Sequence, residues 1–308
     1  MSRSSTAELA RGLAFVGVAV FFFATSPVLT RWAAPFTPFE ITFGRMVVAA
    51  FTILAFLVVA RQRVVLSRAD IPRFFVFGLT CALHFLLYIS SLSYTTIAHS
   101  LALVYTAPVF VTLLAAAFLG EPVVRGQWFG LGIAVAGVGL LTGFEPAMTP
   151  TMAFGDLLAI GSAVCFGFYS IIGRRERGRY PLLTYALAMY AAAAVWLAPP
   201  ALTNLTHEGI TIRAVLAILA LGILPLGLGH TLYNASLRRV HPTYVNLIAT
   251  QEVTGGIVLG YLFLGEAPSA VAIGGALVTL LGIVIVLVCR QDKTGRPAGP
   301  QLGPGGSA

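Results

Sequence analysis

Charged side chains are scarce in this chain. Asp, Glu, Lys and Arg make up only 10% of its 308 residues, whereas hydrophobic residues make up 58%. A soluble domain carries about 25% charged residues, because its surface must face water. The scarcity therefore excludes an ordinary soluble enzyme or binding domain, and it indicates a chain whose solvent is lipid.

Cysteine is rare, and the common catalytic motifs are absent. Cys81, Cys165 and Cys289 lie far apart in apolar stretches without metal-ligand spacing, and we expect them to be small core residues. The sequence contains no HExxH, no GxSxG and no phosphate-binding GxxxxGKS or GxxxxGKT motif, and its five histidines are scattered singly. We therefore expect no catalytic residues, no metal site and no cofactor.

Long apolar runs occupy most of the chain. Runs of about 20 residues between short polar loops are typical of membrane-spanning helices. They are too long for the strands of a membrane β-barrel, and they lack its alternating pattern. We predict an all-α integral membrane protein with ten spans, at residues 12–33, 39–60, 72–93, 97–119, 124–144, 154–173, 181–203, 214–236, 242–264 and 268–289.

The net charge of +8 follows this topology and does not mark a nucleic-acid partner. Sixteen of the nineteen Lys and Arg residues lie in the termini or in alternate loops: Arg3, Arg11, Arg61, Arg63, Arg68, Arg73, Arg125, Arg174, Arg175, Arg177, Arg179, Arg238, Arg239, Arg290, Lys293 and Arg296. The positive-inside rule therefore places both termini in the cytoplasm. Residues 1–11 form the N-terminal segment, and we expect the Gly- and Pro-rich tail 290–308 to be disordered.

An internal repeat divides the chain. The tetrapeptide Phe-Leu-Gly-Glu occurs at 118–121 and again at 263–266, so a shift of 145 residues superposes the two copies. The same shift pairs Tyr88 with Tyr233, and a shift of 144 pairs Arg31 with Arg175. A one-residue change of shift corresponds to a small loop insertion. We interpret the pattern as an internal duplication.

Each copy of the repeat, 12–144 and 154–289, contains five predicted spans. Because five is odd, the second copy enters the membrane from the opposite side. The sequence therefore predicts two inverted five-helix repeats. Inverted repeats are typical of transporters, in which the substrate binds between the two halves.

Both halves end in a Leu-Gly-Glu turn before a glycine-rich last span. In this respect the chain resembles the EamA-type proteins of the drug/metabolite transporter superfamily, over residues 10–290. The resemblance rests on Leu119-Gly120-Glu121, Leu264-Gly265-Glu266, Pro108, Ala24-Thr25-Ser26-Pro27 and Arg31. It implies a ten-helix exporter of amino acids or other small metabolites. The many aromatic residues are similar to those of the YddG group of aromatic amino-acid exporters, but Val253 stands where the second half would match Pro108.

Polar residues inside the predicted spans are candidates for a substrate pathway, because such residues usually face protein or a water-filled cavity. Their spacing places His84 with Tyr88, and His230 with Tyr233 and Asn234, on single helix faces. The alternative is packing against neighbouring carbonyls. The substrate-binding candidates are His84, Tyr88, Tyr105, His230, Tyr233, Asn234, Asn246, Thr250 and Gln251.

Two prolines and two charged residues stand out within the spans. Pro27 and Pro108 each remove a backbone donor, so we expect a hinge or a structural kink at both. Glu252 is the one carboxylate well inside a span, and a low dielectric favours its neutral form, which makes it a candidate proton carrier. Alternatively, Glu252 pairs with Arg45, the one arginine well inside a span.

The fifth and tenth spans are rich in glycine and nearly free of polar groups. Small residues permit close helix packing, so we interpret both spans as a scaffold or as a homodimer face, with a monomer equally open. Glu121 and Glu266 lie at span ends, where we expect each to cap the helix that follows.

Together these features predict a transporter of the bacterial inner membrane. We expect it to export small neutral or zwitterionic metabolites, most of all aromatic or large apolar amino acids, by alternating access through a central cavity. Only Arg45 is a buried base, which disfavours phosphorylated substrates. Other metabolites or drugs remain alternative substrates. An intramembrane lipid-modifying enzyme would need a charged catalytic cluster at one interface, and a channel or a receptor would show no saturable flux.

Overall fold

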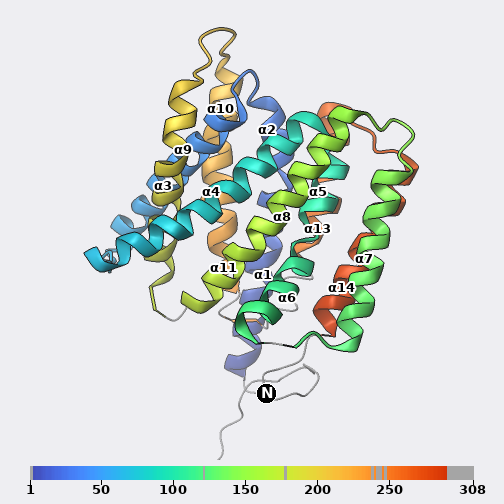
Figure 1. Cartoon of the computed structure of the whole chain (residues 1–308). Helices are drawn as coiled ribbons and strands as arrows, with labels where there is room; N and C mark the ends of the chain where they lie inside the picture. Colours follow the sequence, from blue (N-terminus) through green and yellow to red (C-terminus); the bar gives the residue numbers. More distant parts are fainter. Residues whose placement is uncertain are drawn as a thin grey trace, which may run out of the picture.

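The computed structural model describes residues 3–120, 122–176, 179–236, 239–240, 245 and 248–289. These residues form helices with short connections, and no strand occurs among them (Figure 1). A shorter apolar helix, Gln251–Leu264, stands where we predict the ninth span. In the described part, nine segments are long and apolar enough to cross a membrane: Glu8–Trp32, Pro38–Val59, Arg68–Tyr94, Ile97–Phe118, Arg125–Gly143, Pro150–Ile172, Leu182–Thr203, Ile212–Ser236 and Ala270–Val288. The all-α membrane class is therefore confirmed.

In chain order the elements are α1 (Arg3–Ala24), α2 (Ser26–Trp32), α3 (Pro38–Val59), η1 (Arg68–Asp70), α4 (Ile71–Tyr94), α5 (Ile97–Val104), α6 (Ala107–Leu119), α7 (Arg125–Gly143), α8 (Pro150–Glu176), α9 (Leu182–Thr203), α10 (Ile212–Leu221), η2 (Gly222–His230), α11 (Thr231–Ser236), α13 (Gln251–Leu264) and α14 (Ala270–Val288). Asn246, Glu121 and the tail 290–308 lie outside the described residues.

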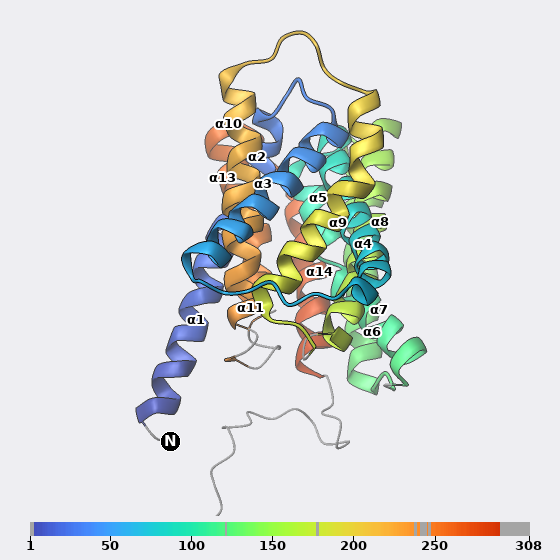
Figure 2. The same cartoon turned by 90° about the vertical axis from the view of Figure 1, so that its left-hand side faces the viewer.

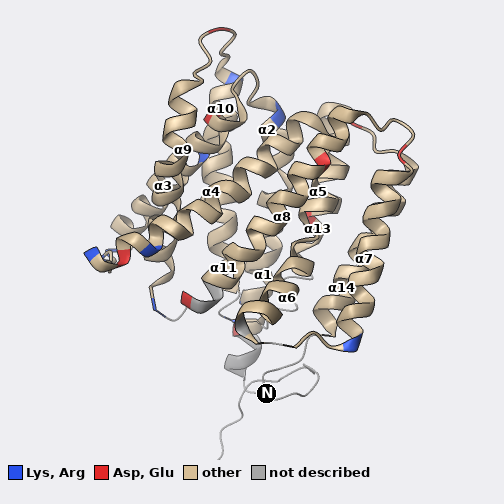
Figure 3. Cartoon of the chain, viewed as in Figure 1, with Lys and Arg blue, Asp and Glu red and all other residues tan. Residues whose placement is uncertain are grey.

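The helices form a bundle with two ends (Figures 1 and 2). We call the end that carries the N-terminus and residues 60–70, 122–125 and 179–181 the basic end. The opposite end carries residues 33–37, 95–96, 144–149, 204–211 and 265–269. Charged residues lie mostly near the helix ends, and few lie along the middle of the bundle (Figure 3). This distribution is what a hydrocarbon environment requires.

Hydroxyl side chains set the start of several helices at the opposite end. Thr37 accepts a hydrogen bond from the backbone nitrogen of Glu40 at 3.3 Å at the start of α3. Thr96 does the same for His99 at 3.2 Å at the start of α5. Each oxygen satisfies one of the backbone donors that the first turn of a helix leaves without a partner.

The first and fourth predicted spans are both interrupted before a proline. The first span breaks at Thr25, whose hydroxyl donates to the carbonyl of Phe22 at 2.6 Å, and Pro27 lies in the first turn of α2. The fourth breaks between α5 and α6, and Pro108 lies in the first turn of α6. Proline fits a first turn because the donor that it lacks is not needed there. The structure thus shows a break before each proline, and hinge motion at either break stays a prediction.

The eighth span is not one continuous α-helix, although the apolar run from 214 to 236 suggests one. It passes from α10 into the π-helix η2, which contains Pro225, and then into α11. Glycines let η2 approach α3 closely: a Cβ atom on Gly222 would lie 2.4 Å from Val48 and 3.0 Å from the carbonyl oxygen of Arg45. A π-helix inside a span often marks a functional site.

Helices α7 and α14 lie side by side (Figure 1). A Cβ atom on Gly282 would lie 2.3 Å from the backbone nitrogen of Ala134, and one on Gly137 would lie 2.3 Å from that of Thr279. Glycine at these positions lets the two backbones touch. Gly137 and Gly282 are therefore used for packing within the chain. A homodimer through these helices stays a prediction.

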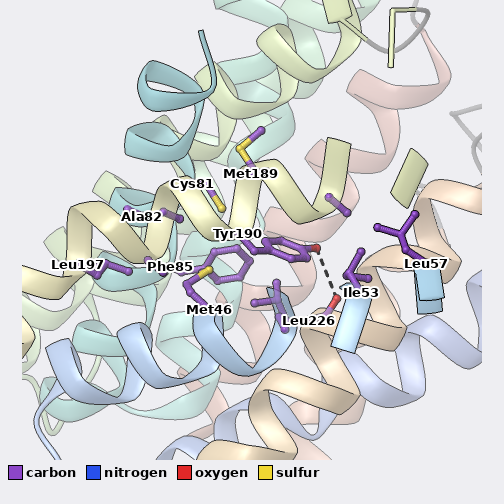
Figure 4. Packing of buried hydrophobic residues seen from close by; sticks show 14 residues of the cluster. Met46, Ile53, Leu57, Cys81, Ala82, Phe85, Met189, Tyr190, Leu197 and Leu226 are labelled. Carbon is purple, nitrogen blue, oxygen red and sulfur yellow. Dashed lines mark hydrogen bonds between the residues drawn. The ribbon is translucent and has the colours of Figure 1, made fainter. Parts of the chain in front are cut away.

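A buried apolar cluster joins α3, α4, α9 and η2 (Figure 4). Met46 on α3 and Phe85 on α4 pack near Tyr190 of α9, whose hydroxyl donates to the carbonyl of Leu226 in η2 at 3.5 Å. Because this cluster combines elements from both predicted halves, it fixes the position of the polar residues beside it.

Candidate functional site

A buried arginine is the most unusual group inside the bundle. Arg45 on α3 is only 1% exposed, and its guanidinium carbon lies 4.6 Å from the centre of the Phe85 ring. The Nε and Nη1 atoms of Arg45 are buried and have no hydrogen-bond partner in the part of the chain that the structure describes. Among the described residues, no carboxylate oxygen lies within 4.0 Å of this guanidinium. The arginine is thus held by an aromatic face and leaves donors unused.

The buried carboxylate has another partner. Glu252 lies in the first turn of α13, is partly buried, and accepts a hydrogen bond from the Tyr105 hydroxyl at 2.5 Å. Tyr105 lies at the break between α5 and α6, so the break points its phenol toward α13. The ion pair between Glu252 and Arg45 is not formed in this structure, although each lies within electrostatic range of the other.

Two further tyrosines approach the same place. Tyr88 and Tyr233, which the sequence repeat pairs, both lie within electrostatic range of the Tyr105 hydroxyl. The hydroxyls of Tyr88 and Ser26 are buried near one another without reaching hydrogen-bond geometry. We call Arg45, Tyr88, Tyr105, Tyr233 and Glu252 the central cluster. It draws on α3, α4, the α5–α6 break, α11 and α13.

The two histidines predicted near the site have aromatic and polar neighbours of their own. His84 contacts the carbonyl oxygen of Ser162 through Nδ1 at 3.1 Å, and the Ser162 hydroxyl donates to the His84 carbonyl at 2.8 Å. These contacts hold α4 against α8, which favours the packing interpretation for His84. The ring of His230 lies between Phe23 and Phe85, at 4.7 Å and 5.6 Å between ring centres. It therefore borders the aromatic face that supports Arg45.

Three other candidates are close in sequence to Tyr233 or Glu252. Asn234 of α11 donates back to the carbonyl of His230, the last residue of η2, at 2.8 Å. Gln251 is exposed, although its neighbour Glu252 is partly buried. Thr250 is buried just before α13. Their roles in substrate binding stay predictions, as does that of Asn246, which lies outside the described residues.

Three tyrosines that are not among the substrate-binding candidates lie beside the cluster. Tyr185 and Tyr190 of α9 lie within electrostatic range of Tyr169 of α8, which is also near Tyr233. Tyr190 lies near Arg45 as well. The signal in the sequence is three tyrosines in the sixth and seventh apolar runs, where a hydroxyl must find a polar neighbour.

The opposite end is joined by a charged contact. Arg31 at the end of α2 donates to the carbonyl of Thr95 at 3.0 Å and to Glu266 at 3.3 Å. Glu266 also accepts a hydrogen bond from the backbone nitrogen of Ile97, the first residue of α5. We call Arg31, Thr95, Ile97 and Glu266 the end clasp. It connects α2 and the α4–α5 turn to the α13–α14 turn.

The expected cap of α14 by Glu266 is wrong. The start of α14 is capped by Ser269, whose hydroxyl oxygen accepts from the backbone nitrogen of Ala272 at 2.9 Å. Glu266 instead caps α5, a helix of the first half. The three-residue spacing that favours Ser269 as the cap is visible in the sequence, whereas a cap across the two halves is not. The equivalent prediction for Glu121 falls outside the described residues.

His99 of α5, the helix that begins in the end clasp, is buried and has two acidic partners. The Nδ1 atom of His99 lies 2.9 Å from Asp156, and its Nε2 atom lies 3.5 Å from Glu145. Glu145 also accepts a hydrogen bond from Ser269. Desolvation raises the pKa of Glu145, but the bonds from Ser269 and Ala147 and the nearby His99 outweigh it and hold that pKa below its usual value.

The contact between His84 and Ser162 leads to a stability prediction. Replacing Ser162 by Ala removes a buried donor and leaves the His84 carbonyl without it. We expect Ser162→Ala to destabilise the protein by about 1–3 kcal/mol and to lower the melting temperature in detergent. Thr142→Ala is the control, because the Thr142 hydroxyl bonds only within α7, to the carbonyl of Val138 at 2.9 Å. An unchanged melting temperature for Ser162→Ala would contradict the packing role.

A bundle of apolar spanning helices with charged groups in its interior defines a multi-span membrane protein with an internal polar site. Comparison with known families then identifies it more closely. The model of the EamA-like transporter family matches residues 10–143 and again residues 153–288. The chain therefore belongs to the EamA-like transporter family.

Individual relatives agree with this membership. The pseudopaline exporter CntI of Pseudomonas aeruginosa is 27% identical over 283 residues, which cover 91% of this chain and 95% of that protein. A probable terminal-alkyne amino-acid exporter of Streptantibioticus cattleyicolor is 30% identical over 63% of this chain and 64% of its own length. A solved crystal structure has a TM-score of 0.64 at 20% identity and covers 92% of this chain and 96% of its own, which shows the fold.

The comparisons and the helices agree on the broad class. The chain is a transporter with several membrane spans. The exporters among its relatives are bacterial, as expected for a protein of the bacterial inner membrane.

Proposed function

We propose that this protein exports small zwitterionic metabolites, amino acids first among them, by alternating access. The observation that carries the proposal is the central cluster. A cation on α3 and a carboxylate on α13 are both held inside the membrane without pairing with each other. Charged groups in a span are costly and usually mark a substrate or ion pathway.

Two observations support the proposed inverted repeat, which this mechanism requires. The family model matches the chain twice, and the shift of 145 that superposes the two copies maps Gly137 onto Gly282. Both glycines lie in the contact between α7 and α14, as they would if a two-fold axis passed between these helices. Two halves related in this way can exchange conformations, which exposes a central site first to one side and then to the other.

The end clasp supports alternating access as well. Arg31 and Thr95 belong to the first half, and Glu266 belongs to the second, so their contacts hold the halves together at the opposite end. The positive-inside rule assigns the basic end to the cytoplasm and the opposite end to the outside. In this arrangement the clasp is an outer gate in its closed position.

The chemistry of the cluster and the relatives favours amino acids. One of the relatives is named as a probable amino-acid exporter. A single buried arginine suits one carboxylate, whereas a phosphorylated substrate would need several buried bases. The tyrosines and Phe85 offer apolar surface for an aliphatic or aromatic side chain.

Transport in proteoliposomes tests the proposal. The purified protein is reconstituted, the vesicles are loaded with one unlabelled amino acid at a time, and counterflow of tritiated phenylalanine and leucine is measured. We expect a saturable flux that apolar amino acids inhibit competitively. We also expect Glu252→Gln to lower this flux at least about 10-fold, because it removes a buried charge.

Glu208→Gln is the matched control, since Glu208 is exposed in the loop between α9 and α10. It should transport like the unaltered protein. Absence of flux across all twenty amino acids, in vesicles that contain folded protein, would contradict the proposed function.

A further inference from the structure

The charge on Arg45 is hard to explain as part of the fold. A guanidinium that is only 1% exposed loses its hydration, and a carboxylate partner is the usual compensation. Among the described residues, Arg45 has no carboxylate within 4.0 Å, and its Nε and Nη1 atoms have no hydrogen-bond partner. The stacking on Phe85 recovers about 2 kcal/mol, whereas burial of an ion costs several kcal/mol.

The groups around Arg45 are also short of acceptors. The buried hydroxyls of Ser26 and Tyr88 lie near one another, but among the described residues neither reaches hydrogen-bond geometry with an acceptor. Tyr88 also lies within electrostatic range of Arg45. Buried polar groups are almost always paired, so each unpaired group calls for an explanation. Several unpaired donors in one region are explained by a ligand that brings oxygen acceptors.

The complementary charge lies across the same region. Glu252 is held by Tyr105 from one side, and the field of Arg45 reaches it without an ion pair. Arg45 comes from the first half, and Glu252 comes from the second. A molecule that carries one carboxylate and one ammonium group would pair with both residues, whereas the two residues do not pair with each other.

We propose that Arg45 binds the carboxylate of the transported molecule and that Glu252, positioned by Tyr105, binds its ammonium group. This inference rests on the proposed function and gives its substrate a polarity: the acid end lies at α3 and the amine end at α13. It also gives a reason why the protein keeps a buried, unpaired charge on Arg45 despite the loss of stability. The unpaired arginine weakens the empty protein, and the substrate removes the penalty.

The test separates binding from folding by comparing two kinds of ligand. Binding of L-phenylalanine, L-phenylalaninamide and 3-phenylpropanoate is measured in detergent by competition with tritiated phenylalanine. The amide lacks the carboxylate, and 3-phenylpropanoate lacks the amine. We expect each analogue to bind about 30-fold or more weakly than phenylalanine, because each leaves one buried charge unpaired. Leucine and its amide are measured in the same way.

Variants of Arg45 test whether this residue binds the carboxylate of the substrate. Arg45→Met should bind phenylalanine at least about 30-fold more weakly and should no longer distinguish it from the amide. Arg45→Lys keeps the charge but loses the planar fork, so it should keep part of the distinction. The melting temperature of ligand-free Arg45→Met should be equal to or higher than that of the unaltered protein, since an unpaired charge is removed.

Arg213→Met is the matched control, because Arg213 stacks on Trp32 at 4.7 Å but is exposed at the opposite end. It should bind all the ligands normally.

An Arg45→Met or Arg45→Lys protein that still prefers the acid to the amide by the full factor would overturn the assignment. A lower melting temperature for both would show a structural role instead. If the unaltered protein neither binds nor transports any amino acid, the proposed function fails together with the inference. If it transports amino acids and Arg45 has no influence, the inference alone fails.

Discussion

Gly282→Ala is expected to have the largest effect on stability of any methyl addition on α14. The new Cβ atom would lie 2.3 Å from the backbone nitrogen of Ala134 and 2.6 Å from the carbonyl oxygen of Gly130. Backbone atoms cannot turn aside as a side chain can, so α7 and α14 must separate. We expect a loss of about 3 kcal/mol. The melting temperature and the yield of monodisperse protein in detergent measure it.

A second glycine of the same helix provides the control. A Cβ atom on Gly274 meets nothing closer than the Cδ2 atom of Leu140, at 4.0 Å. Gly274→Ala should therefore leave the melting temperature unchanged or raise it, because alanine favours helix more than glycine does. Equal melting temperatures for Gly282→Ala and Gly274→Ala would show that α7 and α14 do not touch through their backbones.

Glu266→Ala is expected to open the protein toward the opposite end. The carboxylate holds both Arg31 and the backbone nitrogen of Ile97, so its loss removes a partly exposed ion pair and a helix cap. Together these contacts contribute about 2 kcal/mol, which corresponds to a shift of the open population by a factor of about 30. Glu266→Gln can still accept from Ile97, and Arg31→Gln leaves the cap intact. Both should therefore shift the population less.

Labelling of a central cysteine measures this opening. In a protein whose native cysteines are replaced, Ser26→Cys places a thiol at a buried position beside Tyr88. A membrane-impermeant maleimide added from outside should label it faster in Glu266→Ala than in the unaltered background. Glu208→Ala, which removes an exposed carboxylate at the same end, should not change the rate. Slower or unchanged labelling in Glu266→Ala would exclude the end clasp as an outer gate.

Much of the fold follows from local properties of the chain. The apolar runs predict each of the nine long spanning segments, because a helix satisfies its own backbone in lipid. Pro27 and Pro108 indicate where two spans break, because the first turn of a helix is where proline fits best. The π-helix η2 could not be predicted from the sequence. Gly222 and Gly227 let η2 approach α3 closely, and a single apolar run does not reveal that approach.

The candidate site, too, could be predicted only in part from the sequence. Arg45, Tyr88, Tyr105, Tyr233 and Glu252 stand out in the sequence as polar groups in apolar runs, and the structure brings them together. His84 stands out equally, yet it is satisfied by Ser162 on another helix. Residue type and spacing show which side chains need a partner. They do not show whether a neighbouring helix supplies it.

The sequence by itself determined the solvent of this protein, the approximate limits of the nine long spans that the structure describes, and the two similar parts that the family model matches. Composition and periodicity are enough to predict these features, because each span must satisfy its own backbone hydrogen bonds in lipid. Only the tertiary structure decided that Glu252 pairs with Tyr105, that Arg45 stays unpaired, and that Glu266 caps a helix of the other half. These outcomes depend on which helices become neighbours. That choice is made by packing between residues more than a hundred positions apart, such as Gly137 and Thr279.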